Sequence, residues 1–489
     1  MRGIYTPVTD IRRKVFTEVA RMSYESNEMA DYAKEIRDLP FKIMPGEDSS
    51  LRSSIFLERA IVSERIRLAM GLSLRPVTES VSATEDLEHS VIADKYYEPP
   101  LINVIKFACN KCPEKIIKVT SMCQGCLAHP CQEVCPKKAI SFRNGRSHID
   151  QDLCIKCGRC HDVCPYSAII KNVIPCEDSC PVGAISKDES GKEHIDPEKC
   201  ILCGKCLQSC PFGAVVEMSQ MVDVLKLLAD ENKKVVAMLA PAVLGQFPGT
   251  INNLIGALKK LGFADVVEVA IGADITTRKE AAEFIEKMEN GEKMMTTSCC
   301  PAYYKAADLH IPEIKPFVSH TRTPMYYTAE LLKQEQPECT AVFVGPCLAK
   351  RFEAENDPNV DYVLTFEEIG AMLVASGINV ADCEPQEFAK ISCAQGRRFP
   401  VSGGVAGAVA SLVEGKAEFK PTAINGLNKA SIKLLKQYAT KGSDFNMIEV
   451  MCCEGGCVAG PGCVALAKKS AIMVENYVKT APDLKDKQD

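Results

Sequence analysis

The stretch Glu449-Val450-Met451-Cys452-Cys453-Glu454-Gly455-Gly456-Cys457-Val458 decides how this chain folds. Two further cysteine segments lie upstream in the same half of the protein: Thr297-Ser298-Cys299-Cys300-Pro301 and Gly345-Pro346-Cys347-Leu348-Ala349-Lys350. Together the three segments supply four thiolates, enough to hold an iron–sulfur cluster in a folded core. The two glycines before Cys457 allow the backbone to pass close to a bulky inorganic group. Adjacent cysteines such as Cys299 and Cys300 cannot easily point the same way, so we expect them to do different jobs.

Composition narrows the class of protein. The 489 residues suffice for two to four domains with at least one large core. A formal net charge of −6, without a long basic run, argues against nucleic acid as a partner. We expect no membrane span, because no run of about 18 apolar residues occurs, and no apolar signal segment follows Met1. The 26 cysteines are spaced as metal ligands rather than as a disulfide framework, so we expect a cytoplasmic protein.

Residues 1–100 contain no cysteine. Apolar residues recur at helical spacing between Ile55 and Met70, which predicts a helical N-terminal region. The polar stretch from Pro76 to Pro100 is typical of a linker. We expect residues 1–100 to form a helical region with a linker, residues 101–218 two ferredoxin-like modules, and residues 219–480 a third domain.

Sixteen cysteines lie between Cys109 and Cys210, and their spacing repeats. The first copy contains Cys131, Cys135-Pro136, Cys154, Cys157, Cys160 and Cys164-Pro165; the second contains Cys176, Cys180-Pro181, Cys200, Cys203, Cys206 and Cys210-Pro211. Each copy resembles a bacterial two-cluster ferredoxin module: a short loop, a small hairpin and a second loop. In the spacing C-x2-C-x2-C-x3-C-P, three thiolates surround one cubane and the fourth ligates its neighbour. Zinc is the structural alternative.

The repeat has one defect. Cys123 and Cys126 complete the first copy, but Ala168 and Lys171 stand at the corresponding places of the second. We infer that an upstream pair, Cys109 and Cys112, folds back to complete the second module; zinc or no metal stays open for that pair. The predicted ligand sets are Cys123, Cys126, Cys131 and Cys164; Cys135, Cys154, Cys157 and Cys160; Cys180, Cys200, Cys203 and Cys206; and Cys109, Cys112, Cys176 and Cys210.

The pattern changes after Val216. Apolar runs at 235–239, 266–270 and 340–344 predict strands, and they alternate with helical segments such as 279–290. The run at 340–344 leads straight into Pro346-Cys347. Strands that feed functional loops favour an α/β core, with ligands gathered at the strand ends. The charged tail after about Thr480 is predicted to be frayed. The chain as a whole is therefore expected to be a multidomain α+β and α/β protein.

The three cysteine segments resemble the signatures of the iron-only (FeFe) hydrogenases, and the resemblance covers residues of about 220 to 475. It implies an H-cluster, which is a 4Fe–4S cluster bridged by one cysteine to a two-iron site with carbon monoxide, cyanide and an azadithiolate. The implied ligands are Cys300, Cys347, Cys453 and Cys457, with Cys457 as the bridge. Cys299 would then be the first proton relay and would stay a free thiol.

The resemblance also implies a proton path. Glu280 and Glu283, three residues apart on one expected helix face, match the two relay glutamates, and Ser319 matches the hydroxyl between them. Two glutamates on a helix are more commonly a solvated face. Lys350 matches a residue that hydrogen-bonds a cyanide, as an ammonium suits an anionic group. Further residues match the lining of the two-iron site: Ala240, Pro241, Ala242, Ser402, Gly403 and Met451.

Several positions depart from the family pattern. Gly345 replaces Met, Ala302-Tyr303 replaces Gly-Trp, Cys452 replaces Ala, and Cys463 is extra. None of these changes removes an implied ligand. Cys339, Cys383 and Cys393 match no motif, and we expect them to be buried thiols.

The expected function is reversible reduction of protons to dihydrogen, with electrons relayed through up to four additional 4Fe–4S clusters. Ferredoxin or flavodoxin is the expected electron partner, and maturation proteins would supply the two-iron site. An iron–sulfur assembly protein and a hydrogen sensor on the same scaffold are the alternatives. Cys299 and Lys350 argue against the assembly protein, whose members generally lack the free thiol.

Overall fold

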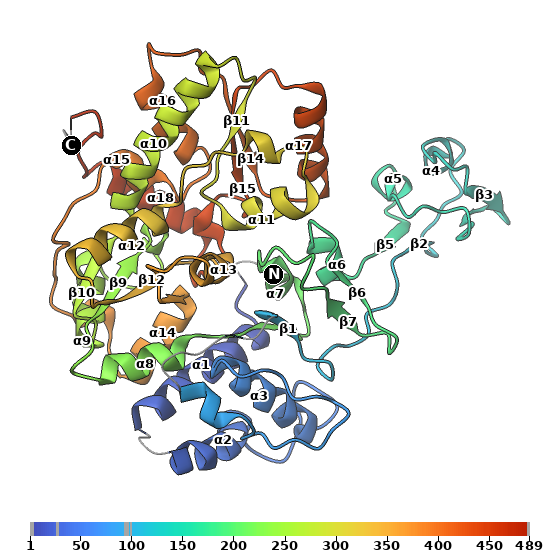
Figure 1. Ribbon diagram of the computed structural model, residues 1–489. Coiled ribbons are helices and arrows are strands. Elements are labelled where there is room, and N and C mark those ends of the chain that lie inside the picture. The colour runs from blue at the N-terminus through green and yellow to red at the C-terminus, as the bar shows by residue number, and fades with distance from the viewer. Residues whose placement is uncertain (1–3, 26–28, 92–96, 98–99, 487–489) are drawn as a thin grey trace.

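The computed structural model describes residues 4–25, 29–91, 97 and 100–486. Among the described residues, four helices precede the first cysteine, and Figure 1 shows α1, α2 and α3 together at the bottom of the molecule. They are α1 (Pro7–Glu25), α2 (Met29–Ile43), α3 (Ile55–Ala69) and the short 3-10 helix η1 (Leu87–Val91). Helix α3 begins at the cap Ser54, whose hydroxyl accepts the Leu57 N–H. The helical N-terminal region was therefore predicted correctly.

The first cysteine-rich module, residues 116–172, projects from the body of the molecule (Figure 1). Two antiparallel strands connect it to the rest, and a hairpin lies inside it. Its elements are β2 (Ile116–Val119), α4 (Pro130–Glu133), β3 (Ile140–Arg143), β4 (Arg146–Ile149), α5 (Arg159–Asp162) and β5 (Ile169–Asn172). It has a small apolar core of its own, with Ile117, Ile140 and Ile169 at the centre.

The second module packs against the body instead. Its elements are α6 (Pro175–Ser179), β6 (Ile185–Lys187), β7 (Glu193–Ile195) and α7 (Lys205–Ser209). Strands β1 (Ile102–Val104) and β8 (Val215–Glu217) pair antiparallel and bring its two ends together. Its core is continuous with that of the C-terminal part, because Ile201 and Leu202 belong to the same cluster as Tyr303 and Leu348.

Two parallel sheets organise the C-terminal part. One has the order β10 (Asp265–Glu268), β9 (Val235–Leu239), β12 (Thr340–Val344) and β13 (Tyr362–Leu364); the other has the order β11 (Met295–Thr296), β15 (Met447–Met451) and β14 (Pro421–Asn425). The helices are α8 (Met221–Ala229), α9 (Ile251–Lys260), α10 (Ala270–Glu289), α11 (Pro301–His310), α12 (Pro324–Glu335), α13 (Ala349–Glu355), α14 (Phe366–Ala375), α15 (Ala394–Arg398), α16 (Gly404–Val413), α17 (Lys429–Lys441) and α18 (Ala467–Val478). Short 3-10 turns are η2 (Pro241–Val243), η3 (Lys315–Phe317), η4 (Val380–Asp382) and η5 (Cys457–Ala459).

The predicted strands at 235–239 and 340–344 are present, whereas the one at 266–270 ends at Glu268 because Ala270 begins α10. The cysteine segments follow the carboxyl ends of strands. Cys347 comes after β12 in one sheet, whereas Cys300 comes after β11 and Cys453 after β15 in the other. Parallel strands of a sheet end at a common edge, so the two sheets present their functional loops to one space between them. Within the described residues, no helix has both the length and the apolar character that crossing a membrane requires.

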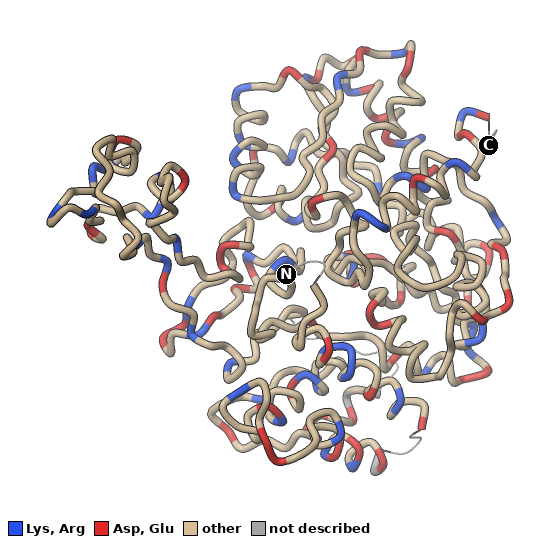
Figure 2. The backbone as a smooth tube through the Cα atoms, turned by 180° about the vertical axis from the view of Figure 1, so that it is seen from behind, with Lys and Arg blue, Asp and Glu red and all other residues tan. Residues whose placement is uncertain are grey.

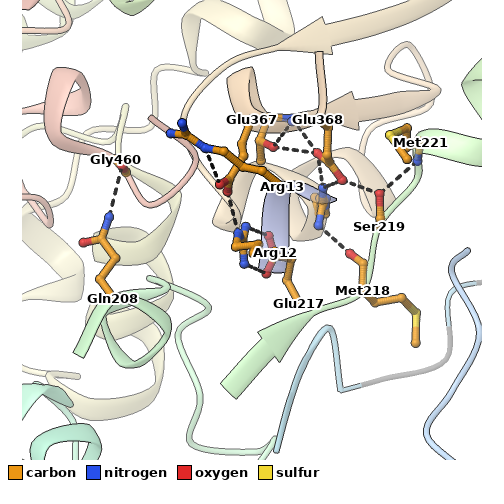
Figure 3. A network of polar contacts seen from close by, with 12 residues as sticks. Arg12, Arg13, Gln208, Glu217, Met218, Ser219, Met221, Glu367, Glu368 and Gly460 are labelled. Carbon is orange, nitrogen blue, oxygen red and sulfur yellow. Dashed lines mark hydrogen bonds and ion pairs between the residues drawn. The ribbon is translucent and has the colours of Figure 1, made fainter. Parts of the chain in front are cut away.

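An ion-pair cluster joins the three parts of the chain (Figure 3). Arg12 of α1 donates to Glu217 of β8 and, through Nε at 2.5 Å, to Glu367 of α14. Beside it, Nη2 of Arg351 donates to both carboxylate oxygens of Glu368, at 2.8 and 2.7 Å. Both partners of the second pair are almost fully buried. Charges this deep are tolerated because each is paired and hydrogen-bonded.

The predicted linker and the predicted frayed tail each contain buried side chains, although residues 76–80 of the linker are exposed. Leu87 and Tyr97 of the predicted linker are buried, while residues 92–96, 98 and 99 lie outside the described residues. In the tail, Leu484 is 1% exposed and its N–H donates to Gln395 at 2.9 Å. The prediction of a frayed tail was wrong for residues 481–486, because one apolar side chain anchors them.

Candidate functional site

A cavity of about 100 Å³ lies between the carboxyl ends of the two sheets. It is lined by the cysteines of all three segments: Cys299, Cys300, Cys347, Cys453 and Cys457. Ala240, Pro241, Ala242, Lys350 and Met451, which the sequence assigned to the same site, also line it. Residues from segments that lie far apart in the chain, from Cys203 to Gly460, therefore converge on one space.

The local structure directs main-chain N–H groups toward the thiols. Cys300 is the N-cap residue of α11, and the N–H groups of Cys452, Tyr303 and Ala302 face its sulfur, although burial raises its pKa overall. Cys347 accepts the N–H of Lys350 at the start of α13. Burial, and then the charges of neighbouring cysteines, raise the pKa of Cys347 and Cys457. Buried thiolates that repel one another fit a shared group that carries positively charged iron.

Cys299 and Cys300 have different surroundings, as predicted. Cys300 faces the cysteines of the cavity and Lys350, whereas Cys299 packs against Ala273, Phe399 and Met451 and faces Glu280. Burial, and then the charge of Glu280, raise the pKa of Cys299 well above its usual value. Cys299 therefore stays a protonated thiol at neutral pH.

Glu280 of α10 is completely buried. Among the described residues neither of its carboxylate oxygens has a hydrogen-bond partner, although the Ser298 peptide and the Ser319 hydroxyl face it. Burial, and then the charge of Glu283, raise the pKa of Glu280 to about 8. An unpartnered buried carboxyl costs folding free energy, and strongly shifted buried carboxyls cluster at functional sites in proteins.

Glu283, one turn further along α10, has the opposite environment. The Ser319 hydroxyl donates to its Oε2 at 2.6 Å, and the His320 N–H donates to its Oε1 at 2.8 Å. Burial alone would raise the pKa of Glu283, but these hydrogen bonds and one from Thr321 lower it overall. Two nearby carboxyls whose pKa values are pushed apart suit an acid and a base in sequence.

Lys350 lies at the wall of the cavity with its ammonium already engaged. It donates to Thr323 Oγ1 at 3.0 Å and to Glu353 Oε2 at 2.6 Å. The side chain is 8% exposed and lies near the ring of Phe343. Its position next to the cavity fits an anionic ligand there, with Glu353 holding the ammonium in place.

Ser402 and Gly403 stand one layer behind the cavity; neither is among the described residues that line it. The Gly403 N–H donates to Glu449 at 2.6 Å, and the Ser402 N–H donates to Gly455. Gly456 has φ of +92°, and a Cβ there would lie 2.4 Å from the Pro400 carbonyl oxygen. Position 456 therefore requires glycine because the backbone passes close to the neighbouring segment at Pro400.

The predicted accessory ligand sets are also brought together. Cys123, Cys126, Cys131 and Cys164 line one small cavity of the projecting module, and Cys135, Cys154, Cys157 and Cys160 line another. In the second module, burial and then the charges of Cys203, Cys200 and Cys180 raise the pKa of Cys206. Burial and the charge of Glu193, followed by the charges of Cys210 and Cys112, raise the pKa of Cys176. No three His, Cys, Asp or Glu side chains among the described residues converge tightly enough for a single metal ion.

Backbone geometry supports Cys109 and Cys112 as the missing part of the second module. In four Cys-x-x-Cys pairs the residue before the second cysteine is left-handed: Lys111, Gly125, Lys156 and Leu202 have φ of +50°, +59°, +57° and +56°. Such φ values are uncommon outside glycine. The upstream pair therefore has the same loop conformation as three pairs within the modules.

A second recurring feature lies in four Cys-Pro-x-x-Ala segments. In each, the alanine N–H donates to the cysteine sulfur at 3.2 to 3.4 Å: Ala139 to Cys135, Ala168 to Cys164, Ala184 to Cys180 and Ala214 to Cys210. Hydrogen bonds to cluster sulfurs are one of the ways a protein tunes reduction potential. The alanine four residues after each of these cysteines is visible in the sequence, but only the cysteine ligands were predicted from the repeat.

Two residues of the site had no predicted role. Glu449 is fully buried behind Gly403 and accepts the N–H groups of Gly403 and Ala406. Cys452 is 2% exposed, and its side chain hydrogen-bonds to Cys203 of the second module. That bond lowers the pKa of Cys203 to about 7. Cys452 was noted only as a departure from Ala, because the contact joins residues that are far apart in sequence.

Comparisons with known proteins agree with this geometry. Residues 233–461 match the profile described as iron only hydrogenase large subunit, C-terminal domain. Residues 175–214 match a 4Fe-4S dicluster domain, and residues 121–174 match the LdpA Fe-S cluster-binding domain. FeFe-hydrogenase HydA1 from Chlamydomonas reinhardtii, in a single-residue variant, superposes on 55% of this chain and 93% of its own with 20% identity and a TM-score of 0.46.

Three relatives differ in how much they share. The NADP-reducing hydrogenase subunit HndD of Solidesulfovibrio fructosivorans is 29% identical over 50% of this chain, which spans about half (53%) of that relative. The cytosolic Fe-S cluster assembly factor NAR1 of Kluyveromyces lactis is 32% identical over 22% of this chain and 24% of its own length. The periplasmic Fe hydrogenase large subunit of Nitratidesulfovibrio vulgaris is 32% identical over 64% of this chain and 85% of its own length. Similarity of that extent, together with the four-cysteine cavity, makes this chain a member of the iron-only hydrogenase family.

Proposed function

We propose that the chain is a hydrogenase that reversibly reduces two protons with two electrons to dihydrogen. Cys300, Cys347, Cys453 and Cys457 would hold the 4Fe–4S part of an H-cluster, with Cys457 as the bridge to the two-iron site. The bound group would supply the iron at which dihydrogen forms. Lys350 would hold its cyanide, and Ala240, Pro241, Ala242, Met451 and, from behind, Ser402 and Gly403 would shape its pocket.

The observation that carries the proposal is the position of Glu280. Its unpartnered carboxyl lies between the Cys299 thiol and the Ser319 hydroxyl, and Ser319 donates to Glu283 at 2.6 Å. A proton that leaves the cavity would pass from Cys299 to Glu280, then through Ser319 to Glu283 nearer the surface. A protein that only stores or delivers clusters has no need of such a path.

Electrons would enter through the projecting module. It carries exposed apolar side chains around its predicted clusters, with Leu127 at 96%, Met122 at 59% and Ile155 at 56%. Residues 113–174 contain nine Lys and Arg against five Asp and Glu, in a chain of net charge −6, and Figure 2 shows these cations spread over the module. Such a surface suits an acidic redox protein, so we propose ferredoxin or flavodoxin as the partner.

The four accessory sets would each bind one 4Fe–4S cluster, with the fourth completed by Cys109 and Cys112. We propose residues 1–100, 101–218 and 219–480 as the three domains, and a cytoplasmic location in which maturation proteins add the two-iron site. A hydrogen sensor would share this cofactor but turn over slowly. An assembly protein is the second alternative, because the similarity to NAR1 favours it over part of the chain.

The test is an infrared spectrum of anaerobically matured protein, first under hydrogen and then under oxidising conditions. We expect carbon monoxide and cyanide bands that shift between the two conditions, together with hydrogen evolution from a reduced donor. Full loading with 4Fe–4S clusters but no such bands would contradict the proposal and leave the assembly protein. Shifting bands with very low turnover would instead identify the sensor.

A further inference from the structure

The second module packs closely against the wall of the cavity at the start of α7. Gly204 has φ of +70°, and a Cβ there would lie 2.8 Å from the Pro461 ring and 3.1 Å from Leu348. Gln208 donates to the Gly460 carbonyl at 3.5 Å (Figure 3). Cys203 directly precedes Gly204. It lines the cavity together with the predicted H-cluster cysteines.

Cys452 is placed between two predicted clusters. Cys452 packs with Cys203, a predicted accessory ligand, and Cys300, a predicted H-cluster ligand, and all three line the same cavity. Its thiol faces the sulfur of Cys203 and its N–H faces the sulfur of Cys300. The residue is buried, and its carbonyl accepts the Leu427 N–H at 3.0 Å. The Leu427 carbonyl in turn accepts a hydrogen bond from Lys205, which follows Cys203 closely in α7. One residue therefore contacts a sulfur ligand on each side.

We propose that Cys452 is the electronic link between the accessory cluster at Cys203 and the H-cluster cubane at Cys300. The route would run from the Cys203 sulfur through the Cys452 thiol and main chain to the Cys300 sulfur, and each transfer would move one electron and no proton. The inference rests on the ligand sets of the proposed function. Cys452 itself would bind no iron and would act by positioning and by donating a hydrogen bond.

The thiol has a predictable effect on the accessory cluster. A hydrogen bond donated to a ligand sulfur stabilises the more negative, reduced cluster and so raises its reduction potential. An alanine at this position would remove the donor to Cys203 but keep the main-chain N–H to Cys300. Loss of the thiol should therefore alter the accessory cluster and leave the H-cluster cubane largely unchanged. A serine would keep a donor.

The experiment is a redox titration followed by electron paramagnetic resonance, on full-length protein loaded with 4Fe–4S clusters but without the two-iron site. In Cys452→Ala we expect one accessory cluster to become about tenfold harder to reduce, which is about 59 mV for one electron. Cys452→Ser should recover most of that shift. Cys339→Ala, which removes a buried thiol 3% exposed and distant from the motifs, should change no potential.

Two results would overturn the inference. Unchanged potentials in fully loaded Cys452→Ala would show that the thiol only fills space. A loss of about four iron atoms per chain in both Cys452 variants would show that Cys452 is itself a ligand. If the unsubstituted protein fails to load five clusters, the ligand sets of the proposed function fail instead, and the two failures are distinguishable by iron content.

Discussion

The two walls of the cysteine-lined cavity are built from different chemistry. On the α10 side, Glu280, Ser319 and Glu283 place carboxyl and hydroxyl groups in line, and their environments push the two carboxyl pKa values apart. On the α7 side, Cys203, Cys452 and Cys300 place sulfur against sulfur in close packing. A proton moves only between groups in hydrogen-bond reach that can change protonation, whereas an electron needs only close approach. We therefore expect substitutions of the proton-carrying groups on the first wall to lower turnover without loss of iron, and substitutions of the cysteines on the second wall to change cluster loading or potential.

The largest expected effect belongs to the α10 wall. Glu280→Gln keeps the size of the side chain but cannot pass a proton on, so hydrogen evolution should fall by about 100-fold or more. Iron content and the infrared bands of the matured protein should stay unchanged. Glu286→Gln, on an exposed turn of the same helix, is the matched control and should keep full activity. Full turnover in Glu280→Gln would remove the proton path.

Loss of a cluster is the next largest effect and belongs to the cysteine-rich side. The double variant Cys109→Ser, Cys112→Ser should lose about four iron atoms per chain, because this pair would complete one cubane. The infrared bands of the H-cluster should persist, as that site shares no ligand with the pair. Cys383→Ser, which replaces a buried thiol that donates to the Asn379 carbonyl and belongs to no cysteine motif, should keep all its iron. Unchanged iron in the double variant would leave the second module with one cluster.

A pH dependence follows from the raised pKa of Glu280. Its folded-state pKa of about 8 exceeds the ordinary value of 4.5, so between these values the folded chain holds a proton that the unfolded chain releases. The stabilisation from this group is fully present below pH 4.5 and is lost as pH rises to about 8. An infrared band of the protonated carboxyl should disappear near pH 8 and be absent in Glu280→Gln. A carboxyl already ionised at pH 6 would contradict this.

The smallest expected effect tests how the α7 wall is fixed. Lys205 donates to the Leu427 carbonyl, and Lys205→Met keeps its aliphatic stem without the donor. We expect a loss of about 1 to 2 kcal/mol in unfolding free energy, seen as a lower thermal midpoint. Lys199→Met removes an exposed ion pair and should change stability little. Equal midpoints in the two variants would show that packing at Gly204 suffices.

The sequence predicted those parts of the site that depend on local pattern. The strand at 340–344 and the loop with Cys347 followed from an apolar run, and the ligand sets followed from the cysteine repeat. The left-handed conformation of Leu202 was not predicted, because no residue preference indicates it outside glycine. Neither was the contact of Cys203 with Cys452, nor the burial of Leu484. Such contacts depend on which distant surfaces meet, and spacing along the chain does not encode that.

The ion pair of Arg12 with Glu367 has a consequence for biosynthesis. Helix α1 leaves the ribosome first, yet its partner is made 355 positions later. Until then, Glu217 is the carboxylate partner available to Arg12, so the docking of α1 against α14 cannot be completed. Both cysteine-rich modules are synthesised in that interval and are open to iron delivery. We therefore expect α1 to dock against β8 and α14 late in folding, after the cysteine-rich modules have been able to bind iron.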